Sequence, residues 1–452
     1  MSGYEKYTLS PVPWIKQMPE HWRLVRGKNL YQKMQRPTSD TDEVVTCFRD
    51  GTVTLRKNRR TTGFTESLKE IGYQGIRKGD LVIHVMDAFA GSIGVSDSDG
   101  KGTPVYSVCQ AKGDSNNQYY ALLLREMAHS GYIQSLYRGI RERSSDFRFE
   151  VFAAQFYPVP PREEQDQIVR FLDWKVSSIN KLIRIRKRQI EELEAIKRSS
   201  IGYLVMGQTQ SIPQRDTEVS WVKTIPAHWN EKTLIQVAEE QQIRNAGMVE
   251  DNLLSLSYGK IINKDINTTD GLLPSSFEGY QIVHDGNIIL RLTDLQNDHK
   301  SLRTGLVTQT GIITSAYTCL KVRHNILPEY LQLQLHVADL CKVFYGMGGG
   351  VRQSIGFKEI RKLVIAIPPI EEQQHILDSV HGVEKPINRA IQNNRDIIAE
   401  LEDLKTRLIS DAVTGKIDVR SIEIPEYEFV DEDIDNADEN PEQGADKPPE
   451  EE

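Results

Sequence analysis

The sequence contains two copies of one pattern, and this internal repeat restricts what the chain can fold into. The segment Trp14–Trp22 reappears as Trp221–Trp229, an offset of 221 − 14 = 207 residues, with tryptophan, proline, histidine and tryptophan in matching places. The segment Pro160–Gln165 reappears as Pro368–Gln373, an offset of 368 − 160 = 208 residues. Solenoid repeats have units of roughly 20–50 residues. The repeat is therefore a whole domain plus a helix, present twice.

Composition places the chain among soluble globular proteins. Of its 452 residues, 38% are hydrophobic and 27% are charged. Its longest apolar runs, such as Leu81–Met86, are much shorter than the ~18 residues that a membrane span needs, and its first residues lack the apolar core of a signal peptide. Its four cysteines form no Cys-x-x-Cys pair. These features predict a metal-free protein of a reducing, cytoplasmic compartment.

The net charge of −8 is concentrated at one end of the sequence. From Asp431 to Glu452 the chain has 11 acidic residues and one lysine, so the remainder has 55 basic and 53 acidic residues, a net charge of +2. A proline-containing acidic segment without aromatic residues cannot bury enough apolar surface to fold. We therefore predict that residues 421–452 form a disordered acidic tail.

Each copy of the repeat begins with short β-like runs separated by glycine and aspartate. Gly79–Asp87 and Gly286–Asp294 both read as a turn, an apolar strand and then an acidic residue. A helical segment follows in each copy, around residues 119–127 and 330–340. The predicted fold class is therefore α+β, with two globular domains built from small mixed sheets and helices.

Two long helices complete the repeats, and their apolar residues follow a heptad pattern. In the first helix the stripe is interrupted only by Arg186, and in the second only by Asn394, which is the equivalent position. The stripe residues are Leu172, Val176, Ile179, Ile183, Ile190 and Leu193 in the first helix, and Val380, Ile387, Ile391, Ile398, Leu401 and Leu408 in the second. Such stripes predict coiled-coil pairing of the two helices. The alternative is that each helix is buried only against its own domain.

The ends of the two helices are also marked. Pro160-Pro161 and Pro368-Pro369 are typical of helix starts, and Gly207 and Gly415 are typical of helix ends. Gly382 and Pro386 predict an early interruption of the second helix, which leaves its main length from about residue 385.

These signals together predict an architecture with an internal pseudo-twofold. If the helices pair in antiparallel fashion and each has ~40 residues, they form a rod of roughly 60 Å with one globular domain at each end. The predicted ranges are 1–158 for the first target-binding domain, 159–207 for the first spacer helix, 208–366 for the second domain, 367–420 for the second spacer helix and 421–452 for the tail.

The sequence contains none of the common catalytic motifs: no phosphate-binding loop, dinucleotide fingerprint, His-Glu-x-x-His or Gly-x-Ser-x-Gly. Gly346–Gly350 is glycine-rich but lacks a surrounding strand–loop–helix unit. We interpret His21 and His228 as packing residues, and Asp87 and Asp294 as turn or cap residues.

Basic clusters are better candidates for function. Arginine and glutamine side chains can recognise base edges, and lysine and arginine side chains neutralise phosphates. They occupy similar frames in the two copies but differ in number, as expected if two similar domains bind different sequences. The candidate DNA-binding residues are Lys57, Arg59, Arg60, Arg141, Arg143, Arg148, Arg291, Arg303, Arg352 and Gln353.

With these motifs in place, the chain resembles the specificity subunits of type I restriction-modification systems. The resemblance covers nearly the whole chain except the acidic tail. The segments that carry it are Ile225–Trp229, Ile367–Ile376 and Leu408–Ile417.

The resemblance implies a non-catalytic subunit of a prokaryotic phage-defence complex. It implies two target recognition domains that bind a bipartite, asymmetric site on double-stranded DNA, and helices that separate the half-sites and bind two modification subunits. Those subunits would carry S-adenosylmethionine and methylate adenine at N6, while restriction subunits, if present, would use ATP and Mg. It implies no cofactor in this chain itself.

Two readings from other classes remain open at the level of the sequence. One is a coiled-coil scaffold that binds only proteins, which sequence-dependent retention of duplex DNA would exclude. The other is a DNA-modifying enzyme with an unrecognised site, which binding of S-adenosylmethionine by the purified chain would favour.

Overall fold

The chain was analysed as a computed structural model that describes residues 2–59, 71–136, 146–208, 212–267, 276–295, 302–323, 325–347 and 355–431. It divides into two compact units. Unit 1 contains residues 1–185 and 396–433, and unit 2 contains residues 186–395 and 434–452. Each unit therefore combines one globular region with a stretch of both long helices.

Unit 1 is built around a four-stranded antiparallel sheet of order β4-β11-β8-β9. These strands are β4 (Tyr31–Lys33), β11 (Tyr106–Ala111), β8 (Leu81–His84) and β9 (Ile93–Val95). The two-stranded ladders join β1 (Tyr7–Leu9) to β2 (Gln17–Pro19), β3 (Arg23–Arg26) to β12 (Phe156–Val159), β5 (Val45–Cys47) to β6 (Val53–Leu55), and β7 (Gln74–Ile76) to β10 (Gly100–Gly102). The helices of this region are α1 (Gly27–Leu30), α2 (Asn117–His129), α3 (Tyr132–Ser135) and α4 (Phe149–Ala154), with 3-10 turns at Arg56–Asn58 and Ala88–Ala90.

Unit 2 has a main sheet with the equivalent strand order, β16-β24-β21-β22. These strands are β16 (Ala238–Glu240), β24 (Thr318–Val322), β21 (Ile288–Leu290) and β22 (Thr304–Leu306). The other ladders join β13 (Gln214–Asp216) to β14 (Thr224–Pro226), β15 (Asn230–Thr233) to β25 (Val364–Ile367), β18 (Leu254–Ser257) to β19 (Lys260–Asn263), and β17 (Ile243–Arg244) to β20 (Gln281–Val283) and β23 (Gly311–Ile313). The helices are α6 (Leu234–Val237), α7 (Pro328–Leu340) and α8 (Phe357–Ile360), with a 3-10 turn at Val343–Gly346. The shared strand order is the outcome that an internal repeat predicts.

The prediction of mixed sheets was wrong for the strands that the structure describes, because every ladder between them is antiparallel. Parallel pairing among these residues is limited to isolated bridges at Val44–Lys101, Val53–Ser96 and Leu253–Ile312. Short strands joined by short turns favour antiparallel ladders, because a parallel connection needs a crossover of a dozen or more residues.

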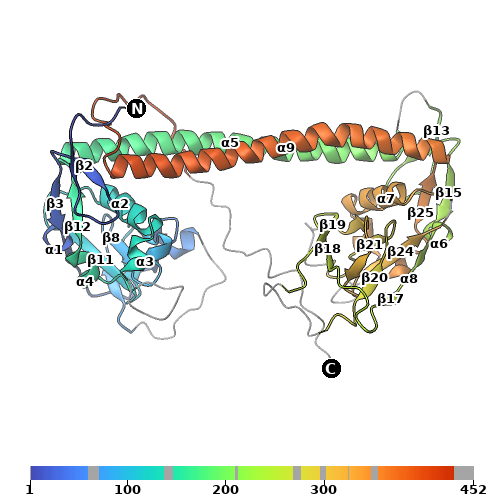
Figure 1. Ribbon diagram of the computed structural model, residues 1–452, viewed down its shortest axis with the longest axis horizontal. Helices are drawn as coiled ribbons and strands as arrows, with labels where there is room; N and C mark the ends of the chain where they lie inside the picture. The colour runs from blue at the N-terminus through green and yellow to red at the C-terminus, as the bar shows by residue number, and fades with distance from the viewer. Residues whose placement is uncertain are drawn as a thin grey trace. The chain divides into compact units, whose positions relative to one another are not determined.

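The two long helices are α5 (Arg162–Val205) and α9 (Ile370–Val413), with 44 residues each (Figure 1). Each is followed after one residue by a glycine in the left-handed conformation, Gly207 at φ 61° and Gly415 at φ 76°, as in common helix ends. The predicted early interruption of the second helix was wrong, since α9 continues through Gly382 and Pro386. Pro386 has no backbone N–H to donate to the Gly382 carbonyl. Because both residues are exposed, water can donate to this carbonyl instead.

Within each unit the two helices run side by side and antiparallel. In unit 1 the early α5 residues Leu172 and Ile179 share a core with the late α9 residues Leu408 and Ala412. In unit 2, Arg186 donates to the Asn394 amide oxygen across 3.4 Å, and Lys197 pairs with Glu384 at 3.0 Å. The apolar stripes therefore pack against the other helix as well as against the globular regions. No helix among the described residues is long and apolar enough to cross a membrane.

Candidate nucleic-acid interface

A repeated polar junction attaches each globular region to a helix start. In unit 1 the buried carboxylate of Glu164, in the first turn of α5, accepts hydrogen bonds from Trp22 Nε1 at 2.9 Å and Tyr4 Oη at 2.6 Å. His21 Nε2 lies 2.7 Å from the other carboxylate oxygen. Acidic side chains are stabilised in the first turn by the helix dipole. The histidine of the repeated motif therefore makes a polar contact with the start of α5.

Unit 2 repeats this junction with the equivalent residues. Glu372, in the first turn of α9, accepts from Trp229 Nε1 at 3.0 Å and lies 2.8 Å from His228 Nε2. The last turn of the other long helix is bound in both units as well. Tyr119 of α2 donates to the Val413 carbonyl at 3.0 Å, and Tyr330 of α7 donates to the Val205 carbonyl at 3.2 Å.

These contacts connect each globular region to the start of one long helix and to the end of the other. Because the donors are buried aromatic side chains bonded to helix termini, the sheet and the helix ends of a unit are held in one orientation. Any loop on the sheet is then presented by a rigid support, which is the arrangement that precise binding sites need.

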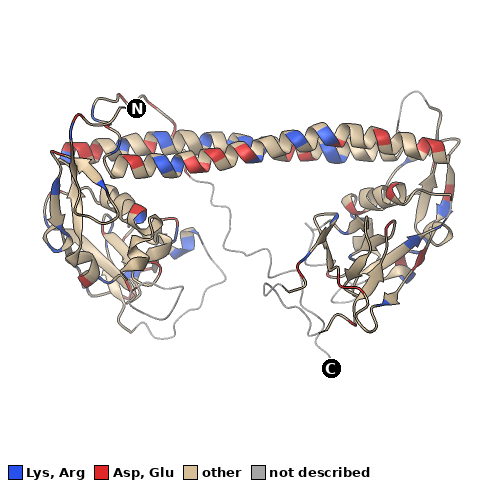
Figure 2. Ribbon diagram, viewed as in Figure 1, with Lys and Arg blue, Asp and Glu red and all other residues tan. Residues whose placement is uncertain are grey.

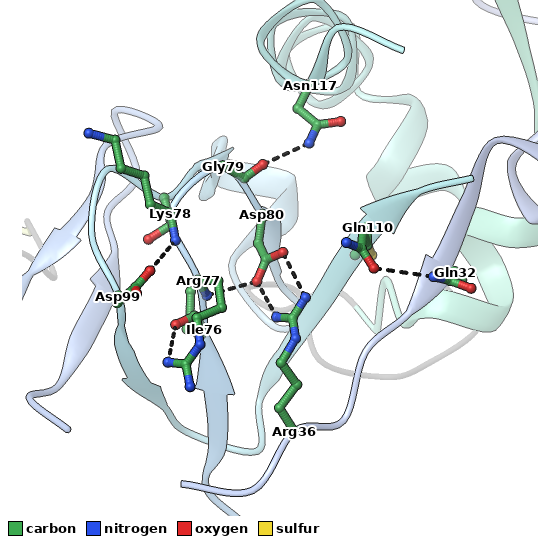
Figure 3. Close-up of polar contacts among 12 residues, drawn as sticks. Gln32, Arg36, Ile76, Arg77, Lys78, Gly79, Asp80, Asp99, Gln110 and Asn117 are labelled. Carbon is green, nitrogen blue, oxygen red and sulfur yellow. Dashed lines mark hydrogen bonds and ion pairs between the residues drawn. The ribbon is translucent and has the colours of Figure 1, made fainter. Parts of the chain in front are cut away.

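A second polar network holds the turn before β8 in unit 1 (Figure 3). Arg36 contacts both oxygens of Asp80, and Asp80 also accepts from the Arg77 backbone N–H at 2.8 Å. Both partners are largely buried, with 19% and 6% of their side chains exposed. In unit 2 the equivalent residue is Asn287, which accepts from the His284 backbone N–H at 2.8 Å. The turn is thus conserved between the units while the charged pair belongs to unit 1.

The β5–β6 hairpin of unit 1 brings a cation to the end of β8. Arg49, whose side chain is 64% exposed, pairs with Asp87 at 3.2 Å, and Asp87 lies 3.7 Å from His84 Nε2. Burial lowers the pKa of His84, against the opposing effect of Asp87. The Asp87 backbone N–H also donates to His84 Nδ1 at 3.0 Å. The group therefore presents one exposed guanidinium supported by a carboxylate.

The predicted DNA-binding residues divide into three groups. Five of them lie outside the described residues, namely Arg60, Arg141, Arg143, Arg352 and Gln353. Most of the glycine-rich segment 346–350 also lies outside the described residues. Arg291 is half-buried and immediately follows β21, an inner strand of the main sheet of unit 2. The remaining four have defined contacts.

Three of these four pair with carboxylates in unit 1. Lys57 is bonded to Glu43 at 2.7 Å and 2.5 Å, and Arg148 to Asp146 at 2.6 Å, and both cations have more than half of their side chain exposed. Arg59 pairs with Asp50 at 2.7 Å and is only 15% exposed, with its guanidinium 4.1 Å from the centre of the Phe48 ring. Exposed pairs of this kind are worth little in free energy. Lys57 and Arg148 are therefore the members of the set most easily transferred to a phosphate.

Arg303 requires a correction, because it is fully buried. Its guanidinium donates to the backbone carbonyls of Thr293 at 2.7 Å and Arg291 at 3.2 Å. It also donates to the Tyr345 hydroxyl at 3.0 Å. A buried guanidinium with these partners holds the β21–β22 region together and does not reach a base edge. Its positive charge in the sequence was misread as a surface feature.

Two exposed residues with better geometry were missed by the sequence analysis. Arg49 is described above, and Tyr258 lies at the tip of the β18–β19 hairpin with 80% of its surface exposed. Tyr258 and Gly259 have φ values of 47° and 77°, which is typical of a two-residue hairpin turn. A large aromatic residue in the left-handed region is rare. The signal was present as Tyr-Gly directly after the alternating run Leu254–Ser257.

Among the residues that the structure describes, no group of histidine, cysteine, aspartate and glutamate side chains could hold a metal ion. Cys47, Cys109 and Cys319 are buried in the sheets, and burial raises the pKa of each thiol. Protonated, buried thiols are poor nucleophiles and poor ligands.

Comparisons with known proteins agree with these observations. The sequence profile of the type I restriction modification DNA specificity domain matches residues 305–403. The chain is also 24% identical over 271 residues to the putative type I restriction enzyme MjaX specificity subunit of Methanocaldococcus jannaschii, covering 58% of this chain and 60% of that relative. The chain is therefore similar to type I restriction-modification specificity subunits over these residues. Its match spans about three-fifths of the length of this curated relative.

The fold of this chain is also found in a solved structure. A structure described as the structural basis of complex assembly and conformational transition of the type I R-M system superposes with a TM-score of 0.61. The superposition covers 88% of this chain and 99% of that chain at 15% identity. At this identity the likeness concerns the fold alone.

Proposed function

We propose that this specificity subunit recognises a bipartite, asymmetric site on double-stranded DNA, one half through unit 1 and the other through unit 2. It then positions two modification subunits for methylation of adenine at N6 and, where they are present, two restriction subunits for cleavage. The chain itself carries out no chemistry. S-adenosylmethionine belongs to the modification subunits, and ATP and Mg belong to the restriction subunits.

One observation carries this proposal: the two units have the same scaffold but different exposed residues. The sheet order and the Trp–His–Glu junction recur in both. The hairpins on these scaffolds differ, with Arg49 exposed in unit 1 and Tyr258 exposed in unit 2. Equal supports with unequal contacts are suited to two different half-sites, because specificity comes from contacts to base edges and affinity from phosphates.

We infer that the DNA-contacting set includes Arg49, Lys57 and Arg148 in unit 1 and Tyr258 and Arg291 in unit 2. Lys57 and Arg148 would exchange their carboxylate partners for phosphates. Arg49 can bind guanine in bidentate fashion, and Tyr258 can contact a thymine methyl group or stack on a base.

The antiparallel helices would set the gap between half-sites. Two recognition units joined by one stiff element add their binding energies without a second loss of translational freedom. We propose that α5 and α9 form a coiled coil related by a pseudo-twofold, with the polar Arg186–Asn394 contact at its centre fixing the register.

Methylome sequencing tests the proposal directly. The chain is produced with its modification subunit in a host that lacks adenine methylation. N6-methyladenine in a two-part motif with a fixed gap is the expected result. Exchange of residues 24–155 for another recognition domain should change only one half of the motif. A soluble complex that leaves the genome unmethylated would favour the scaffold function instead.

A further inference from the structure

The segment that follows α9 in unit 1 has no counterpart in unit 2. After Gly207 the chain continues into β13 and the second globular region. After Gly415 it turns back over α5, where residues 419–431 lie along the helix (Figure 1). We call residues 419–431 the strap. The prediction of disorder for 421–452 was therefore wrong for residues 421–431, and residues 432–452 lie outside the described part of the chain.

Side chains of α5 hold the strap by its backbone. Gln167 donates to the carbonyls of Val419 at 3.1 Å and Ile422 at 2.7 Å. Ser177 accepts from the Val430 backbone N–H at 2.7 Å and donates to the Glu428 carbonyl at 3.0 Å. Backbone groups paired in this way define the path of an extended segment independently of its side chains.

Further contacts anchor both ends of the strap. Asn180 donates to the Val430 carbonyl at 3.2 Å, and Lys181 pairs with Glu428 at 3.0 Å. The side chains of Val419 and Val430 are buried, with 0% and 6% of their surface exposed. The strap is therefore an integral part of unit 1.

Two of the α5 side chains that hold the strap are replaced on the equivalent face of α9. With the helix offset of 208, the residues that correspond to Gln167 and Ser177 are His375 and Lys385, and both are exposed. A lysine has donors only, so it cannot accept the backbone N–H that Ser177 accepts. Asn180 corresponds to Asn388, so the difference between the two faces lies at the Gln167 and Ser177 positions.

The strap presents aromatic side chains to solvent. Phe429 is 64% exposed and Tyr427 is 38% exposed, although the neighbouring Val430 is buried. Exposed aromatic residues on a fixed backbone are typical anchors of protein interfaces, since they bury much area at little entropic cost. The α5 residues Leu182 and Ile185 are also exposed, at 48% and 46%.

The charges around these aromatic residues indicate which partner fits. Glu423, Glu426, Glu428 and Asp431 are exposed and acidic, and Glu428 pairs with Lys181 of α5. The one cation of the strap, Arg420, pairs with Asp418 at 2.6 Å. Carboxylates repel DNA phosphates, so the surface suits a protein with an apolar pocket and a basic rim. Basic and acidic residues are interspersed along α5 and α9 themselves (Figure 2), so this acidic character belongs to the strap.

From these observations we infer that the strap is a docking element for one modification subunit, which makes the two modification-subunit sites unequal. This inference rests on the proposed function. In unit 1 the partner contacts the strap with Phe429 as its anchor. In unit 2 the equivalent partner contacts the bare face of α9. The two copies of the partner therefore bind in two steps of different affinity.

Titration of the modification subunit into the specificity subunit, followed by native mass spectrometry, tests this inference. The full chain should bind two copies with stepwise constants that differ by more than the statistical factor of four for equal sites. Phe429→Ala should weaken one step at least tenfold and leave the other unchanged. Leu9→Ala, which removes another exposed apolar side chain of unit 1 (87% exposed), should change neither step.

Two further variants separate the strap from the acidic tail. A chain that ends at Asp418 lacks both and should lose the same step as Phe429→Ala, whereas a chain that ends at Asp431 lacks only the tail and should behave as the full chain. Ser177→Lys copies the α9 residue Lys385 and should release the strap without removing it. Binding steps that stay unchanged, or a step that becomes stronger on strap removal, would overturn the inference. Failure of every variant, including the full chain, to bind any modification subunit would refute the proposed function itself.

Discussion

Trp22 donates its indole N–H to the Glu164 carboxylate across 2.9 Å, and this bond joins the repeated motif at the start of the chain to the first turn of α5. The two residues are 142 positions apart in sequence. Their counterparts in unit 2 make the same bond across 3.0 Å. The two repeated sequence motifs are therefore the two sides of one contact.

Removal of this carboxylate should destabilise unit 1. In Glu164→Ala the donors of Trp22 and Tyr4 remain buried without their acceptor, at a cost of roughly 1–3 kcal/mol for each group. We expect the free energy of unfolding to fall by about 2–4 kcal/mol. Urea titration followed by tryptophan fluorescence measures it. As a control, Glu163→Ala replaces an exposed neighbour and should change the free energy of unfolding by less than about 0.5 kcal/mol. Equal effects of the two variants would contradict the role assigned to Glu164.

Arg303→Met should behave as a core substitution of unit 2. The carbonyls of Thr293 and Arg291 and the Tyr345 hydroxyl lose a buried donor, so we expect a loss of about 3 kcal/mol or more. The half-exposed Arg323, which pairs with Glu239 at 3.4 Å, provides the control, and Arg323→Met should cost less than about 1 kcal/mol. A folded, fully stable Arg303→Met protein with reduced DNA affinity would restore the original prediction of a DNA contact.

At Tyr258 stability and recognition should change in opposite directions. Asparagine tolerates the left-handed conformation better than tyrosine, so Tyr258→Asn should leave the free energy of unfolding unchanged or raise it by up to about 1 kcal/mol. The loss of the exposed ring should reduce methylation and relax one half of the motif. Thermal melts measure the change in stability, and methylome sequencing measures the change in recognition. Tyr203→Ala, which removes an exposed aromatic side chain of α5, is the control. Unaltered methylation by Tyr258→Asn would exclude this hairpin tip from the DNA contact.

The stability of unit 2 should decrease in mild acid because of His336. Burial, and then the charge of Lys197, lower the pKa of this histidine below its usual value of 6.5. The unfolded state therefore binds a proton before the folded state does. The corresponding stability is fully present above pH 6.5 and is lost as the pH falls from there through the lower pKa of the folded state. Urea midpoints measured between pH 8 and pH 5 should fall less steeply for His336→Gln, and parallel slopes for both proteins would contradict this.

Lengthening both helices by one heptad should change the gap between the half-sites. An insertion of seven residues after Gln189 with a matching one after Ile391 preserves the antiparallel pairing and adds about 10 Å of helix. At 3.4 Å per base pair this corresponds to about three base pairs. An insertion after Gln189 alone should alter the gap less predictably, because it shifts the register of the stripes. A folded variant that methylates sites of unchanged spacing would show that the helices do not set the gap.

Much of the secondary structure could be predicted because it depends on local patterns. The heptad stripes and the Pro-Pro starts are properties of neighbouring residues, and they place α5 and α9 within the predicted ranges. The repeat predicted two similar domains, and only the structure showed that their main sheets have equivalent strand orders. The continuation of α9 through Pro386 could not be predicted, since it depends on which side of the helix faces water.

The candidate site was less predictable, since the sequence reports a side chain's charge but not its burial. Arg303 and Lys57 have the same sign, but only the tertiary structure decides that one is in the core and the other on the surface. Tyr258 attracted no notice, because its exposure depends on the hairpin that carries it.

The sequence alone determined that this protein is a duplicated α+β chain with two long amphipathic helices, because periodicity and repetition are encoded in order and spacing. Only the tertiary structure decided which residues meet across long separations, such as Trp22 with Glu164 or Ser177 with Val430. It also decided that the two copies differ, since the strap is held by α5 and its backbone partners could not be inferred from residue types. Local order follows from short-range preferences, whereas pairing and burial follow from how the whole chain packs.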